Sequence, residues 1–273
     1  MSDTININNN LSFLYKNNIY NFDIQGESFW GGDYCMLDND VNLLSNTSFK
    51  DTGFMPIDFL DREMRNDLRH GIGIYINRLL DASFITDFSK YHEFVDDNVH
   101  LALTSKLVGI PISDFPINPE IIIAFLSDFL KQKLALQPSH SKELKPHFCL
   151  RIVRPNFRDN NPLHRDVWID RLRNAVNIFF PITMPYENSN LGLIPGSHLW
   201  NESEIKRTKS GALVNGTKYS VPTVVETKHE LCFQRPSLKN TQALIFSPYL
   251  IHGAAINFTQ MTRVSLEMRF WKK

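Results

Sequence analysis

The second half of the chain consists of short apolar runs, rich in β-branched and aromatic residues, with Pro, Asn and Gly between them. Runs of this length and composition are typical of β-strands, and several at such spacing predict a sandwich or a jelly roll. The clearest of them cover residues 147–153, 175–182, 241–247 and 263–271. We therefore expect a double-stranded β-helix, a cupin-like jelly roll, as the core of the fold.

The first half has a helical pattern instead. In residues 58–80 apolar side chains recur at steps of three and four, which predicts an amphipathic helix. Residues 119–134 predict a second helix, because Pro119 suits a first helical turn and the apolar residues that follow share one face. From Leu11 to about Trp30 polar and apolar residues alternate, for example at residues 18–24, which suggests a strand before Gly26. We therefore expect helices to dominate this half.

No repeat or linker divides the 273 residues, so we expect one domain over residues 11–273. Residues 1–10 are polar and rich in Asn, and we expect them to form a disordered tail. Within the domain, residues 11–145 are predicted to be mostly helical, and residues 146–273 to form the jelly roll that carries the functional site. The predicted fold class is mainly β with α, with the helical half packed against the jelly roll.

The charge balance bears on the partners of the protein. Lys plus Arg and Asp plus Glu both number 29, so the formal net charge is zero. Nucleic acids and anionic membranes usually select a basic excess, so we expect neither as a partner. The cysteines Cys35, Cys149 and Cys232 show no CxxC spacing, which favours free thiols in a reducing compartment. With no signal-peptide pattern and no apolar segment of membrane-spanning length, we expect a cytoplasmic protein.

The pair His164 and Asp166 is the first candidate for chemistry. In an extended chain, residues two apart project to the same face, so both side chains can converge on one ion. The composition alone predicts about one such pair by chance, so the alternative is a solvated loop His beside an Arg–Asp pair. A second histidine, His252, follows an apolar run and directly precedes Gly253. Two histidines and one carboxylate are the facial triad that holds ferrous iron and leaves other positions open for substrate and oxygen.

Arg263 lies at the start of the last apolar run, in which apolar and polar residues alternate. Arg263 and Ser265 therefore share the polar face of this predicted strand. A buried guanidinium needs an anion, and a dicarboxylate cosubstrate would pair with it in bidentate fashion. The alternatives are an Arg263 that faces the surface or an internal ion pair with Glu267.

Three ordered motifs in the C-terminal part of the chain, about 125 residues, resemble those of the phytanoyl-CoA dioxygenase family of iron- and 2-oxoglutarate-dependent oxygenases. The motifs are His164-x-Asp166, the run Leu193-Ile194-Pro195-Gly196-Ser197-His198, and His252-Gly253 followed by Asn257-x-Thr259 and Arg263. The first 140 residues carry no such motif.

The resemblance implies a set of site residues. His164, Asp166 and His252 are expected to bind Fe(II) and to form the catalytic centre, and Arg263 with Ser265 to anchor the distal carboxylate of 2-oxoglutarate. Three further expectations complete the set: Asn177 among the cofactor-binding residues, His198 in a structural or rim-lining position, and dioxygen as the second cosubstrate. The implied reaction is hydroxylation of an unactivated C–H bond of a small polar metabolite, with formation of succinate and carbon dioxide.

Substrate-binding residues are expected around the iron motif. Trp168 is a candidate to stack on a sugar ring, in keeping with a sugar or amino-sugar substrate, or else caps the sandwich. Arg154 and Arg158, with Arg171 and Arg173 nearby, are candidates for a substrate phosphate or carboxylate, or else form a solvated face.

Two other functions use the same residues or the same fold. One is an enzyme with the same site that catalyses desaturation, epimerisation or ring closure. The other is a non-catalytic jelly-roll module that binds or senses a ligand, because a fold alone does not determine a function.

Overall fold

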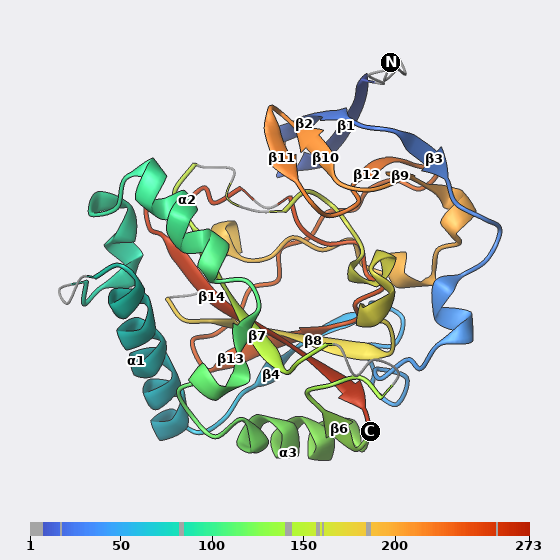
Figure 1. Cartoon of the computed structure of the whole chain (residues 1–273). Helices are drawn as coiled ribbons and strands as arrows, with labels where there is room; N and C mark the ends of the chain where they lie inside the picture. Colours follow the sequence, from blue (N-terminus) through green and yellow to red (C-terminus); the bar gives the residue numbers. More distant parts are fainter. Residues whose placement is uncertain are drawn as a thin grey trace.

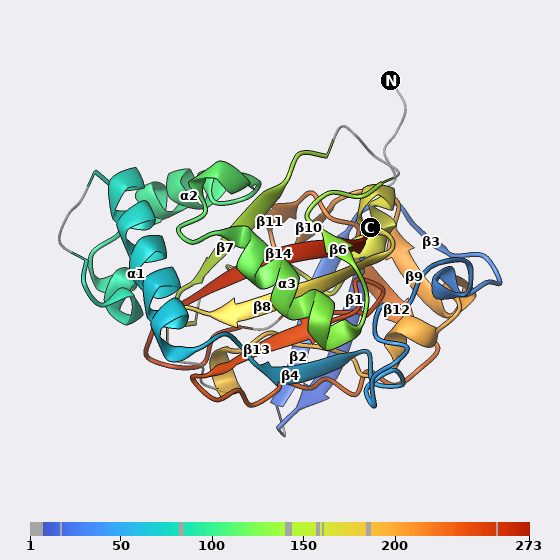
Figure 2. The same ribbon diagram turned by 90° about the horizontal axis from the view of Figure 1, so that it is seen from below.

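The computed structural model describes residues 8–16, 18–81, 85–139, 144–156, 159, 161–183, 187–254 and 256–273. Its strands form a large antiparallel sheet and two smaller ones, which together make a jelly roll (Figure 1). The smaller sheets lie over one face of the large sheet, and the helices α1 and α3 lie over the opposite face (Figure 2). The predicted fold class, a mainly β jelly roll with helices packed against it, is confirmed.

The large sheet has seven strands in the order β4-β13-β8-β14-β7-β5, with β6 paired to β14. The strands are β4 (Phe54–Asp58), β5 (Ile110–Pro111), β6 (Leu134–Ala135), β7 (His147–Val153), β8 (Ala175–Pro181), β13 (Gln242–Phe246) and β14 (Arg263–Lys272). The four runs expected as strands are thus β7, β8, β13 and β14, and the last of these lies between β8 and β7.

The smaller sheets have the orders β1-β2-β10-β11 and β12-β9-β3. Their strands are β1 (Asn8–Tyr15), β2 (Asn18–Gln25), β3 (Ser28–Trp30), β9 (Ile205–Thr208), β10 (Ala212–Val214), β11 (Thr217–Tyr219) and β12 (Val224–Thr227). Each small sheet combines strands from the start of the chain with strands from its last third, so the two ends of the sequence build one layer.

Among the described residues between β4 and β7, three segments form α-helices: α1 (Arg62–Leu79), α2 (Asp97–Lys106) and α3 (Pro119–Leu130). Helix α1 begins later than the apolar pattern predicts, because the carboxylate of Asp61 caps it by accepting a hydrogen bond from the Met64 amide. Helix α3 ends earlier, because Lys131 adopts a left-handed conformation (φ 54°) that terminates the turn.

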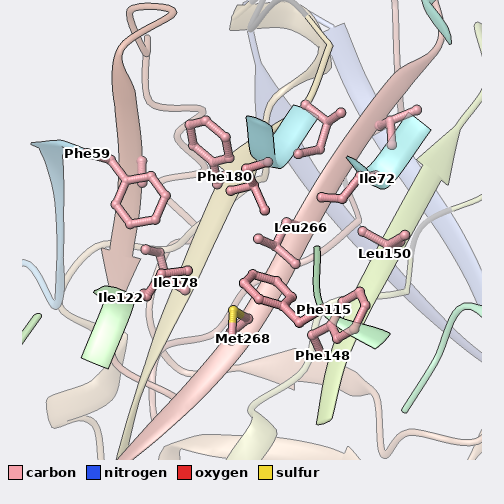
Figure 3. Packing of buried hydrophobic residues seen from close by; sticks show 14 of the residues in the cluster. Phe59, Ile72, Phe115, Ile122, Phe148, Leu150, Ile178, Phe180, Leu266 and Met268 are labelled. Carbon is pink, nitrogen blue, oxygen red and sulfur yellow. The ribbon is translucent and has the colours of Figure 1, made fainter. Parts of the chain in front are cut away.

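The main hydrophobic core lies between these helices and the large sheet. Ile72 of α1 and Ile122 of α3 are fully buried against sheet residues such as Phe148, Ile178 and Leu266 (Figure 3). Their positions on the helices follow the three- and four-residue steps that predicted α1 and α3. This packing holds the large sheet, and with it β8 and β14, in a fixed position under the functional site.

The first 58 residues differ in part from the expectation: the strand predicted at residues 18–24 is present as β2, but further strands lie around it. The segment 11–145, predicted to be mostly helical, begins with strands β1 to β4, and helices occupy only its later part. Residues 8–10, expected in a disordered tail, pair with residues 23–25 in the first hairpin, while residues 1–7 lie outside the described part. The physical reason is the alternation of buried apolar side chains in both hairpin strands, which gives each strand one face for the core.

None of the helices in the described part of the chain is both long enough and apolar enough to cross a membrane.

The core packing predicts different effects for two isoleucines of α1. Ile72 is fully buried, whereas Ile74, two residues along, is 56% exposed. Ile72→Ala leaves a cavity in the core and is expected to lower the free energy of unfolding by about 2–5 kcal/mol. Ile74→Ala is the matched control, with an expected change within about 0.5 kcal/mol. Urea denaturation measures both, and equal losses for the two variants would contradict this packing.

Candidate metal centre

His164, Asp166 and His252 lie together in the interior, with their ligand atoms all within 4.8 Å of one another. The Oδ1 atom of Asp166 is 3.6 Å from Nε2 of His164 and 3.9 Å from Nε2 of His252. The two histidines face each other across an antiparallel bridge, with backbone hydrogen bonds of 2.9 and 3.0 Å. All three side chains are less than 10% exposed.

Backbone carbonyls fix the orientation of both imidazoles. Nδ1 of His164 lies 2.8 Å from the carbonyl oxygen of Pro162, and Nδ1 of His252 lies 3.0 Å from that of Leu250. With the Nδ1–H groups donating to these carbonyls, each Nε2 keeps its lone pair for another partner. Both Nε2 atoms point toward the same oxygen of Asp166, so three donor atoms converge on one point.

Gly253 makes the approach of the two histidine segments possible. Its φ of +114° lies in a region that side chains rarely adopt, and a Cβ atom there would lie 2.4 Å from the carbonyl oxygen of Pro162. Only glycine fits at this position. Steric exclusion of any side chain therefore explains why a glycine follows His252 in the third motif.

The second oxygen of Asp166 is held from the large sheet. Its Oδ2 accepts a hydrogen bond of 2.8 Å from Nδ2 of Asn177 in β8. It also accepts two from Arg269 in β14, at 3.0 Å from Nη2 and 3.2 Å from Nε. Asn177, expected among the cofactor-binding residues, thus contacts the carboxylate of the triad. The Oδ1 atom is left facing the histidines.

The electrostatics favour the protonation states that metal ligands need. Burial would raise the pKa of Asp166, but Arg269 and the two histidines outweigh it and hold the pKa well below its usual value. Burial, with the neighbouring His164, lowers the pKa of His252 to about 4. At neutral pH the site therefore holds a carboxylate and a neutral His252 imidazole, and a divalent metal binds to such forms.

These residues fit a ferrous ion. Two imidazole nitrogens and one carboxylate oxygen are the donor set of the facial triad. Nδ1 of each histidine and Oδ2 of Asp166 already have hydrogen-bond partners in the protein, so the two Nε2 atoms and Oδ1 remain for the metal. Hydrogen bonds from neighbouring groups to metal ligands of this kind are a regular feature of metal sites.

Arg263 lines the same cavity as the triad. It is 2% exposed, donates a hydrogen bond of 2.8 Å from Nη1 to the Ser189 carbonyl, and stands over the ring of Phe179. Burial lowers its pKa to about 9, because the interior disfavours its charge. The alternative partner, Glu267, forms an ion pair with Arg151 at 3.2 Å. The position of Arg263 therefore suits an anion that enters this cavity.

Ser265 lies one step along the same face of β14 as Arg263. Its Oγ atom is buried and has no hydrogen-bond partner among the described residues. A buried hydroxyl without a partner is costly, and a ligand oxygen would satisfy it.

Arg269 and Arg151 were not among the residues predicted from the sequence, and Glu267 was considered only as an alternative partner of Arg263. Arg269 and Glu267 continue the alternating face that begins with Arg263, so the period of the strand would have placed them beside the site. Arg151 faces Ser265 across the β7–β14 pairing and lines the cavity of the triad. These charged groups make the floor of the cavity polar.

Trp168 and Arg154 have other contacts than those expected. The indole Nε1 of Trp168 donates to Glu202 at 3.0 Å, and the guanidinium of Arg207 lies 4.9 Å from its ring. Arg154 is buried and forms ion pairs with Asp159 and Asp97. Neither lines the cavity of the triad, so their positions give no support to a role in substrate binding.

The remaining candidates lie in different places. Arg171 is exposed at the rim of the cavity, and Arg173 forms an ion pair with Asp40 at 2.7 Å. Arg158 lies outside the described residues. His198 is buried, with Nε2 2.8 Å from the carbonyl oxygen of Lys50, in the structural position expected for it.

The two hydrogen bonds from Arg269 predict a role in metal affinity. Arg269→Met removes them and lets the carboxylate of Asp166 rotate, so we expect metal affinity to fall by about 10- to 100-fold. Arg269→Lys keeps the charge, and its metal affinity is expected to lie between those of Arg269→Met and the parent protein. Titration of the metal-free protein with Fe(II) under anaerobic conditions measures this. Arg62→Met, at an exposed arginine of α1, is the control, and equal affinities for both Met variants would refute the role of Arg269.

The chain is similar to several solved structures at low sequence identity. AviO1 from Streptomyces viridochromogenes Tue57 is 16% identical, with 82% of this chain and 91% of that chain covered and a TM-score of 0.46. EctD from S. alaskensis with 2-oxoglutarate and 5-hydroxyectoine is 13% identical, with coverages of 90% and 84% and a TM-score of 0.49. The non-heme monooxygenase ThoJ in its nickel complex is 13% identical, with coverages of 85% and 77% and a TM-score of 0.46.

The sequence matches no curated protein. It does match a family model, described as phytanoyl-CoA dioxygenase (PhyH), over residues 53–265. The match begins in front of β4 and includes the three helices, so it extends well into the part of the chain in which the motifs had shown no resemblance. The expected family is confirmed: the chain belongs to the phytanoyl-CoA dioxygenase family of iron- and 2-oxoglutarate-dependent oxygenases.

Proposed function

We propose that the protein is a dioxygenase that couples the oxidative decarboxylation of 2-oxoglutarate to the hydroxylation of an unactivated C–H bond of a small molecule. Succinate and carbon dioxide are the coproducts. One observation carries the proposal: three metal-ligand atoms and a buried arginine, Arg263, share one cavity.

In this proposal His164, Asp166 and His252 hold the iron. Once bound, Fe(II) supplies the activation of dioxygen, with 2-oxoglutarate as the source of electrons. The protein contributes the fixed orientation of the three ligands, which the carbonyls of Pro162 and Leu250 and the side chains on Asp166 provide. A facial arrangement leaves positions open for the cosubstrate and for oxygen.

Arg263 and Ser265 bind the distal carboxylate of 2-oxoglutarate in this proposal. The guanidinium offers paired N–H donors, and the hydroxyl of Ser265 offers one more. Because both groups are buried, water does not compete for them, and a charge-assisted bond is stronger there than at the surface. In this arrangement 2-oxoglutarate spans the distance between the iron and Arg263.

Arg269 and Asn177 keep Asp166 anionic and hold its second oxygen away from the iron in this proposal. With Oδ2 held in this way, Asp166 would offer the iron Oδ1 alone, and a facial triad leaves other positions for the cosubstrate and oxygen. The substrate approaches from the mouth of the cavity, on the side of β5, β7 and β11.

The test of this function is an anaerobic titration of the metal-free protein with Fe(II) and then with 2-oxoglutarate. We expect a weak visible charge-transfer band that requires both components, followed by succinate release once oxygen is admitted. Product analysis separates hydroxylation from desaturation, epimerisation and ring closure, which use the same site. Absence of iron binding would favour a non-catalytic binding module.

Variants of two site residues are expected to separate metal binding from cosubstrate binding. Arg263→Leu removes the anion partner and is expected to weaken 2-oxoglutarate binding by about 2–5 kcal/mol while iron affinity is retained. His164→Ala is expected to abolish iron binding and turnover together. Calorimetric titrations measure both affinities, with Arg62→Leu at an exposed site as the control. If Arg263→Leu binds the cosubstrate as well as the parent protein does, Arg263 is not its anchor.

A further inference from the structure

A cavity of about 760 Å³ leads from the metal centre to the surface. Its floor includes His164, Asp166 and Arg269, and its walls come from β5, β7, β11 and the 3₁₀ turn at residues 170–172. A cavity of this size accommodates a small organic molecule. In the proposed function, this is the path by which substrate reaches the iron.

The walls of the cavity carry an excess of positive charge. The described lining residues include five Lys or Arg side chains: Lys145, Arg151, Arg171, Lys218 and Arg269. The one carboxylate among the described lining residues is Asp166, which belongs to the metal centre. The whole chain has equal numbers of acidic and basic residues, so this excess is a local feature and not an effect of composition.

The inner and outer cations differ in their partners. Arg151 and Arg269, near the floor, form ion pairs with Glu267 and Asp166. Lys145, Arg171 and Lys218, at the mouth, are exposed, and the described part of the chain contains no acidic side chain within ion-pair distance of them. The charge at the floor is therefore balanced, while the charge at the mouth is not.

The three outer cations come from separate parts of the fold. Lys145 precedes β7, Arg171 lies in the 3₁₀ turn after the metal motif, and Lys218 lies in β11 of a small sheet. Like charges that share one concave surface repel one another and create a positive potential, which favours an anion. Apolar side chains, among them Leu144 and Ile169, also line the cavity and suit a carbon skeleton.

We propose that the substrate carries an oxyanion, a phosphate or a carboxylate, which Lys145, Arg171 and Lys218 bind at the mouth of the cavity. The carbon skeleton then extends inward to the metal centre. This inference rests on the proposed function, since it concerns the substrate of the same site. The outer anion site is distinct from the one at Arg263, because Arg263 lines a separate, smaller cavity together with His252.

The test uses three probes that share a benzene ring: phenyl phosphate, benzoate and the neutral benzyl alcohol. Binding to the full chain is followed by ligand-observed NMR at constant ionic strength. One series uses the metal-free protein, and the other uses protein saturated with Zn(II) and 2-oxoglutarate, so that the site at Arg263 is already occupied. The first series does not depend on iron chemistry, so a failure of the proposed oxygenase function would be seen separately.

We expect at least one anionic probe to bind in both series, about tenfold or more tightly than benzyl alcohol. The anion that binds more tightly identifies the substrate's anionic group as a phosphate or a carboxylate. Added salt is expected to weaken binding of the anion and to leave binding of benzyl alcohol unchanged, because salt screens exposed charges. Failure of both anions to bind, or loss of their binding when 2-oxoglutarate is present, would overturn the proposal.

Variants locate the anion. The double variant Lys145→Met/Lys218→Met and the single variant Arg171→Met are expected to weaken the bound anion, the double variant by about tenfold. Lys90→Met, at an exposed lysine in the 3₁₀ segment Phe88–Glu93, is the matched control and is expected to bind like the parent. Thermal unfolding confirms that each variant is folded. An anion affinity that stays unchanged in both test variants would overturn the assignment of these residues.

Discussion

The two oxygens of Asp166 have different partners, and the arrangement of the site depends on this division. Oδ2 is held by Arg269 and Asn177, which belong to adjacent strands of the large sheet, while Oδ1 faces His164 and His252. The histidine segments lie outside the large sheet and pair with each other. The carboxylate thus joins the large sheet to the segments above it, and the helices that cover the far face keep that sheet in place.

Strand β14 contributes to both sides of the large sheet. Its residues Val264, Leu266, Met268 and Phe270 are buried in the main core under the helices. The alternate residues, from Arg263 to Arg269, face the cavity of the metal centre and form a row of charged and polar groups. Because side chains alternate along a strand, one strand can supply both an apolar core and a polar site. This also explains why ordinary apolar packing suffices to position the charged groups.

Much of the site and of the C-terminal fold could be predicted from local patterns. The spacing of His164 and Asp166 and the alternation around Arg263 are local, and so are the runs that became β7, β8, β13 and β14. The contacts that were missed join distant segments: Gln25 pairs with Leu213, and Trp168 donates to Glu202. Alternation predicted the strand that became β2, but no periodicity within a short window contains such pairings, so the partners of the N-terminal strands and the role of Trp168 could not be found from the sequence.

The most direct test of the central claim is a crystal structure of the protein with Mn(II) and 2-oxoglutarate, with anomalous scattering used to locate the metal. We expect one metal site bonded to Nε2 of His164, Nε2 of His252 and Oδ1 of Asp166, with Oδ2 still held by Arg269. The cosubstrate should extend from this metal to Arg263. A metal bound elsewhere, or an Asp166 that turns both oxygens to the metal and releases Arg269, would contradict the account.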